Sequence, residues 1–166
     1  MSPRNARIGA LLAFLAVVAA ACWWWTRPER QIRAILDDVA AALTYDRGES
    51  GLQALAAVAA LEKHLAPLIS VQTGDAPSIE GRDAVITAGA RWRARTPAMR
   101  VRFLDPRITF SDDRTATLVA SAEALVWTGT GEQRVDRRRV TATITRAADR
   151  WVVSIARASP VSEPLP

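Results

Sequence analysis

The residues of this chain that could carry out acid–base chemistry are few. The sequence holds one tyrosine, Tyr45, and one histidine, His64. A phenol or an imidazole beside a carboxylate in an apolar pocket can move a proton or hold a developing negative charge. Tyr45 is followed directly by Asp46. This pair is the first candidate for a pocket site, and the structural interpretation is that Tyr45 packs at a rim while Asp46 ends a helix.

His64 and Trp92 complete the pocket candidates, and each also has a purely structural interpretation. His64 follows Lys63 near the end of a predicted helix, where the helix dipole favours a cation. Trp92 stands between Arg91 and Arg93, so we expect it either in the core or in a pocket between two cations. Because none of these residues forms a recognised motif, we assign no catalytic residue from the sequence.

The remaining carboxylates are weaker candidates for a catalytic acid. Asp75 stands in a predicted turn. Asp105 stands at a predicted irregularity of a strand. Glu123 lies in a strand whose even-numbered positions from 116 to 126 are all apolar. If that apolar row faces the helices, Glu123 points away from any pocket, because successive strand side chains alternate between faces.

Several other kinds of site are excluded by residue counts. One cysteine, Cys22, rules out a disulfide framework and a multi-thiolate metal site, and one histidine rules out two-histidine motifs. The pair Gly129 and Gly131 lies in a hairpin turn rather than between a strand and a helix, so it is not a phosphate loop. We expect no metal and no cofactor.

The charge balance argues against a nucleic-acid partner. The formal net charge is +5, and beyond Arg4 and Arg7 the chain has 20 basic and 17 acidic residues. A nucleic-acid-binding domain concentrates more positive charge than this. A cluster at Arg134 and positions 137–139 indicates either a solvated strand face or an anionic-surface contact.

The N-terminal segment carries the strongest signal in the sequence. Residues 8–25 contain no charged or hydrogen-bonding aliphatic side chain, and as a helix they would span about 27 Å, close to the roughly 30 Å of a bilayer core. Three tryptophans at positions 23–25 fit an interfacial aromatic belt. We expect an uncleaved signal anchor at residues 1–25. It would place the protein in a bacterial cytoplasmic membrane as a single-pass protein with its domain on the outer side.

Two other fates of this segment remain open. Cys22 follows three alanines, so a lipoprotein signal with a lipidated Cys22 is one alternative. Cleavage after an Ala-x-Ala site at residues 19–21 is the other.

Helix and strand patterns follow a short linker at residues 26–30. Apolar residues repeat with helical spacing from Ile32 to Leu43. A second helix is expected over 52–65, a short strand over 68–73, and a third helix over 82–95. Four strands then follow, over 100–110, 115–127, 134–146 and 150–158. The Asp105-Pro106 step predicts a bulge or an edge position in the first of these, because proline lacks the ladder donor.

This order of elements resembles the nuclear transport factor 2-like superfamily, which includes SnoaL-like and ketosteroid isomerase-like proteins. The segment from Glu80 to Ile86 is similar to the family's segment in which a glycine leads into the third helix. Residues 112–118 resemble its hairpin entering a long strand, and Arg150 to Ile155 looks like its final strand. The resemblance covers residues 31–159, and we expect residues 160–166 to be a loose tail.

The resemblance implies an α+β fold, in which a cone-shaped, curved, mixed or antiparallel sheet wraps around three helices. In this chain a transmembrane helix would precede it. Such cones often hold a pocket, and homodimers often form through the sheet face. We therefore expect non-catalytic binding of a small apolar ligand or of a protein partner at the cell envelope. The alternative is a SnoaL-like or ketosteroid isomerase-like enzyme acting on a small hydrophobic substrate.

Overall fold

The computed structural model describes residues 14–18, 27–74 and 76–161. Residues 14–18 are helical, and the rest of the expected anchor, Cys22 included, lies outside the described residues. Within the part of the chain that is described, no helix is long and apolar enough to cross a membrane. Asp75 and most of the expected tail also lie outside the description.

Three helices fill one side of the domain. Helix α2 spans Pro28–Leu43, α3 spans Gly51–Glu62, and α4 spans Arg82–Arg95. Helix α2 therefore begins within the expected linker, and Pro28 occupies its first turn, where the missing N–H costs no hydrogen bond.

The ends of α3 and α4 have local causes. Ser50 and Gln53 form a reciprocal capping box at the start of α3. Gly81 precedes α4 with φ +89°, a conformation that a side chain would strain, and its N–H donates to the Ile69 carbonyl at 2.7 Å.

The strands form one mixed six-stranded sheet in the order β2-β1-β6-β5-β4-β3. Its long strands are β3 (Ala98–Asp112), β4 (Thr115–Trp127), β5 (Gln133–Ala147) and β6 (Arg150–Pro160), which pair antiparallel in sequence order. Strand β1 (Leu65–Thr73) runs parallel to β6, and the short β2 (Ile79–Glu80) pairs antiparallel with β1. The expected α+β fold with a mixed sheet is confirmed.

One expected boundary and one missed strand need correction. The second helix ends at Glu62 rather than Leu65, because Leu65 already pairs with Val153 in the sheet. Strand β2 is too short to leave a periodic signal in the sequence. The irregularity at Asp105-Pro106 is confirmed, since the β3–β4 register shifts between Leu104 and Arg107 on an edge strand.

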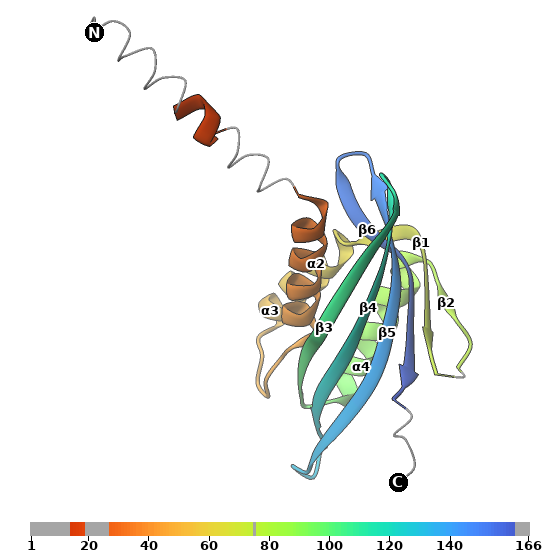
Figure 1. The fold of residues 1–166 in the computed structure, drawn as a ribbon. Coiled ribbons are helices and arrows are strands. Elements are labelled where there is room, and N and C mark those ends of the chain that lie inside the picture. Colours follow the sequence, from red (N-terminus) through yellow and green to blue (C-terminus); the bar gives the residue numbers. More distant parts are fainter. Residues whose placement is uncertain (1–13, 19–26, 75, 162–166) are drawn as a thin grey trace, which may run out of the picture.

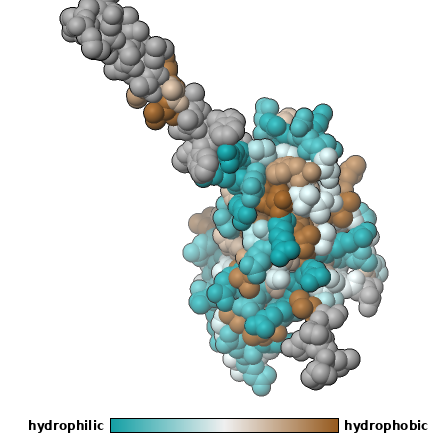
Figure 2. Space-filling view, viewed as in Figure 1, coloured by the Kyte–Doolittle hydropathy of each residue, from teal (hydrophilic) through white to brown (hydrophobic). Residues whose placement is uncertain are grey.

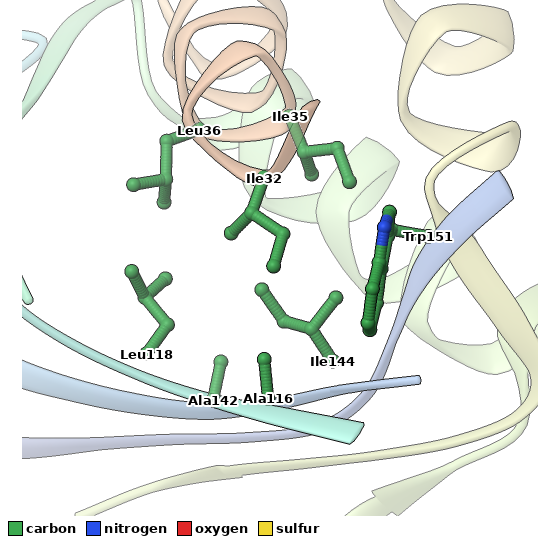
Figure 3. Close-up of a cluster of buried hydrophobic side chains, with 8 residues drawn as sticks. All are labelled: Ile32, Ile35, Leu36, Ala116, Leu118, Ala142, Ile144 and Trp151. Atoms are coloured by element: carbon green, nitrogen blue, oxygen red, sulfur yellow. The ribbon is translucent and has the colours of Figure 1, made fainter. Parts of the chain in front are cut away.

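The core lies between α2 and the concave face of the long strands. Figure 1 shows α2 lying at the β3 edge and α4 behind the sheet. In Figure 3, Ile32 points from α2 toward Leu118 and Ile144 on the sheet. Figure 3 also shows the other members of this cluster, which are Ile35, Leu36, Ala116, Ala142 and Trp151. The apolar row of β4 therefore faces the helices, as the alternation predicts.

Candidate functional site

An apolar cavity of about 440 Å³ lies between the three helices and the concave face of the sheet. This volume falls within the range of small-molecule sites. Its floor comes from the sheet, including Leu118, Val140 and Ile144, and its opposite wall comes from α2, α3 and α4. Helices α3 and α4 contribute to this wall without burying any residue fully, because the cavity lies where a core would otherwise be.

One charged residue, Arg93 on α4, stands in the described wall of this cavity. Its Nε donates to Glu49 at 2.9 Å, and its Nη2 contacts both carboxylate oxygens of Glu49. Its Nη1 donates to the Ala42 carbonyl at 3.0 Å, near the end of α2. The two charged side chains are only 16% and 20% exposed, so this ion pair is well shielded from water.

Tyr45 lies beneath that ion pair and joins the helices to the sheet. Its N–H and C=O pair with Met99 at 2.8 and 2.9 Å, and the Arg93 guanidinium carbon lies 4.2 Å from the centre of its ring. This stacking places a cation over an aromatic face, an attractive arrangement. Arg93 therefore fastens α4 to α2, to Tyr45 and to the loop that carries Glu49.

The Tyr45 hydroxyl is buried, and among the described residues it makes no hydrogen bond of ordinary geometry. The Thr96 side chain approaches it without completing one. Burial raises the pKa of the Tyr45 phenol above its ordinary value of 10.0, and the Thr96 side chain and the Arg93 charge offset part of that rise. The phenol thus stays protonated at neutral pH.

A second, more open hollow of about 600 Å³ adjoins the cavity. Its residues come from the loop between α2 and α3 and from the facing sides of α3 and α4. Tyr45, Val58, Ala90 and Arg93 line both hollows. Glu49 lines only the outer one, so it reaches Arg93 from the side away from the cavity. We call this second hollow the outer groove.

The structure separates the four pocket candidates. Tyr45 and Trp92 line the cavity, with Tyr45 6% exposed and Trp92 55% exposed. The expectation of a core position for Trp92 is therefore wrong, because α4 covers a cavity rather than a packed interior. Asp46 lines only the outer groove and lies 3.3 Å from Arg100 on the surface.

His64 lies outside both hollows. Its Nε2 is 2.9 Å from an Asp38 carboxylate oxygen, to which the Lys63 ammonium also binds at 3.0 Å. These two contacts, Lys63 first, hold the pKa of Asp38 below its ordinary value of 3.8. His64 also accepts the Val153 N–H through its backbone carbonyl at 2.8 Å. Its side chain and backbone therefore tie α2 to the sheet.

Glu123 points away from the cavity, as the strand alternation predicts. It accepts hydrogen bonds from Arg137 at 3.0 Å and from Arg102 at 2.9 Å on the outer face of the sheet. These contacts, Arg137 first, hold its pKa below the ordinary value of 4.5. Asp105 also lies outside the cavity, at the bulge of β3 with φ +51°.

Sequence reasoning missed the pair of Arg93 and Glu49. The two residues are 44 positions apart, and neither forms a motif with its neighbours. The one available signal was that Arg93 directly follows Trp92, which the sequence had already singled out as a pocket candidate. Nothing in the sequence indicates that Glu49 reaches that arginine.

A curved mixed sheet that encloses three helices and an apolar cavity defines a pocket-containing α+β domain. Residues 32–162 match the SnoaL-like domain family. The chain therefore belongs to this family, and the expected resemblance is confirmed at that level. No curated protein shows significant sequence similarity to the chain.

Solved structures share the fold at low sequence identity. A provisionally assigned dehydratase of the nuclear transport factor 2-like family, from Streptomyces avermitilis, has 16% identity and a TM-score of 0.66, covering 81% of this chain and 97% of its own. A provisionally assigned scytalone dehydratase from Novosphingobium aromaticivorans has 13% identity and a TM-score of 0.67, with coverages of 82% and 95%. The Kfla4162 protein from Kribbella flavida has 14% identity and a TM-score of 0.68, with coverages of 81% and 90%. At these identities the likeness concerns the fold.

Proposed function

We propose that this SnoaL-like domain binds a small apolar molecule in its cavity without transforming it. The observation that carries the proposal is the described wall itself, which is mostly apolar, with Tyr45, Thr73 and Arg93 as the exceptions. An apolar cavity holds water poorly. Filling it with an apolar molecule lowers the free energy, because the apolar surface of the molecule leaves water.

The absence of a carboxylate or an imidazole from the described part of the wall favours binding over catalysis, because the Tyr45 phenol there stays protonated and cannot serve as a base. Among the described lining residues there is no carboxylate and no imidazole. A ketosteroid isomerase-like reaction needs a base within hydrogen-bond reach of the proton that it moves. The enzyme alternative would therefore require a group that these residues do not supply.

The sequence also supports a proposed location. The apolar run at residues 8–25 supports a single-pass anchor in a bacterial cytoplasmic membrane, with the domain on the outer side. A reporter enzyme that works only in the cytoplasm, fused after Pro166, should be inactive. An active cytoplasmic reporter would reverse the proposed topology.

The binding proposal is tested by filling the cavity. Val140 lines it from β5, whereas Val119 lies on the outer face of β4. We expect the full chain in lipid nanodiscs to bind 2-naphthalenemethanol, measured calorimetrically against empty nanodiscs. Val140→Phe should weaken binding at least about tenfold, or about 1.4 kcal/mol, because the new ring occupies the ligand's space. The matched control Val119→Phe should bind as the wild type does, and equal loss in both variants would contradict the proposal.

A further inference from the structure

The cavity is charged at one point, and the charge there is already neutralised. Arg93 is the charged residue in the described wall, and Glu49 binds it through both carboxylate oxygens from the outer groove. The Ala42 carbonyl accepts a further hydrogen bond from the guanidinium, donated by Nη1. A ligand in the cavity therefore meets an arginine whose charge and most of whose hydrogen-bonding capacity are committed.

An anionic ligand would gain little from this arginine. Its carboxylate would have to share the guanidinium with Glu49, and two carboxylates at one cation repel each other strongly in a shielded site. It would also lose its hydration on entering an apolar space, a cost that only an available cation could offset. A neutral apolar molecule has neither difficulty.

From this geometry we infer that Glu49 determines the charge class of the ligand, so that the cavity accepts neutral apolar molecules and rejects organic carboxylates. The inference rests on the proposed binding function and adds the ligand class to it. In this role Glu49 is a specificity-determining residue that acts through Arg93, by excluding the wrong ligand rather than by touching the right one.

Two probes of matched shape test the inference. One is 2-naphthalenemethanol, which is neutral, and the other is 2-naphthoate, which is an anion at neutral pH. With the full chain in lipid nanodiscs, we expect the neutral probe to bind at least about tenfold more tightly, and the preference to exceed that of empty nanodiscs.

Glu49→Gln should change that preference in one direction. The amide keeps the size of the side chain but leaves the Arg93 charge uncompensated, so 2-naphthoate should bind at least about tenfold more tightly than to the wild type. Binding of the neutral probe should change less than about twofold. Glu62→Gln is the matched control, because it removes a surface carboxylate that lies 3.7 Å from Arg82, and it should change neither affinity. Adding Arg93→Gln to Glu49→Gln should abolish the gain in 2-naphthoate binding.

The outcomes separate this inference from the proposed function. If neither probe binds the wild type, the binding proposal itself fails. If the neutral probe binds but 2-naphthoate binds as tightly, the inference is overturned, and this comparison needs no variant. The inference is also overturned if folded Glu49→Gln, verified by circular dichroism, gains nothing for the anion. If Glu49→Gln does not fold, the wild-type comparison decides.

Discussion

At the scale of single residues, the environment of the Tyr45 hydroxyl is unusual. Its hydroxyl is shielded from water and has no hydrogen-bond partner of ordinary geometry among the described residues. A buried polar group in that state costs free energy that an apolar side chain of the same shape would not. Tyr45 therefore contributes to the fold through its ring and its backbone pairing rather than through its hydroxyl.

The pKa of Tyr45 gives a direct test, because the chain has no other tyrosine to obscure it. Burial raises the pKa of the phenol, so tyrosinate absorbance of the folded protein should titrate above pH 10.0 and return to its ordinary range in urea. The unfolded chain ionises first, so the free energy of unfolding should fall as pH rises through 10.0. Tyr45→Phe should lack that fall, and a folded-state midpoint at or below pH 10.0 would contradict the burial.

Asp38 shows the opposite linkage at the other end of the pH scale. Its pKa is lowered by Lys63 and then by His64, so its contribution to stability is present above its ordinary pKa of 3.8 and is lost as pH falls through the lower folded pKa. We expect Asp38→Asn to reduce the free energy of unfolding by at most about 1 kcal/mol at neutral pH, because the carboxylate is half-exposed. Urea unfolding of both proteins should show the difference shrinking below pH 3.8. A constant difference would assign the effect to packing.

At the scale of elements, α2 and α3 differ in what they bury. The spacing of apolar residues in α2 predicts one buried stripe, and the structure places Ile32, Ile35 and Leu36 there. Residues 54–61 of α3 are all apolar, yet none of its residues is fully buried. Periodicity reports which face of a helix turns inward, but it does not report whether atoms fill the space that the face meets.

Truncating one leucine in the core beneath α2 and one leucine on α3 should show how differently the two helices are packed. Leu118 on β4 is 2% exposed, and Leu55 on α3 is 67% exposed. Leu118→Ala should lower the free energy of unfolding by about 2–5 kcal/mol, because it leaves a void in the core beneath α2. Leu55→Ala should change it by less than about 0.5 kcal/mol. Denaturant titrations measure both, and similar losses would mean that α3 packs as tightly as α2.

The strands were the most predictable elements, for a physical reason. Strand β4 has an apolar residue at every even-numbered position from 116 to 126, and that face is buried over the first half of the strand. That face also tells which way Glu123 points. Strand β2 has two residues, so its position depends on pairing with β1, which no local pattern encodes.

At the scale of the whole molecule, the outer face of the sheet constrains self-association. Exposed arginines occupy it on three strands, β3, β5 and β6, with Glu123 of β4 between two of them: Arg100, Arg102, Arg107, Arg137, Arg139 and Arg157. Figure 2, viewed from the side of this face, shows hydrophilic and hydrophobic residues intermixed. The homodimer through the sheet face stays a prediction. In such a dimer the arginine-bearing outer faces of the two copies would repel each other, because both are positively charged.

Raising the salt concentration should therefore promote formation of that dimer rather than its dissociation. Raising the ionic strength from about 0.01 M to about 1 M shortens the screening length from roughly 30 Å to roughly 3 Å and weakens the repulsion. We expect sedimentation equilibrium of the full chain, in a density-matched non-ionic detergent, to show a larger dimer fraction at high salt. Arg139→Gln with Arg157→Gln should shift the dimer toward lower salt. A dimer that dissociates as salt rises would contradict this expectation.

The site was less predictable than the fold because it is assembled across the chain. Tyr45 could be singled out as the one phenol, and Trp92 by its neighbours, and both reach the cavity wall. His64 was indistinguishable in sequence from a ligand-binding residue, because Asp38 approaches it only after α2 has packed beside the end of α3. The same holds for Glu49 and Arg93.

The parallel pairing of β1 with β6 has a consequence for biosynthesis. Leu65 pairs with Val153, and Thr73 pairs with Ala158, so a wall of the cavity cannot close until the C-terminal strand has been synthesised. The helices and β1 must wait with exposed apolar surface while about half the chain is still being translated, a state prone to aggregation. A chain stopped before Arg150 would lack both the strand that bridges β1 to β5 and the Trp151 ring. Premature termination should thus abolish the enclosed cavity altogether rather than shorten it.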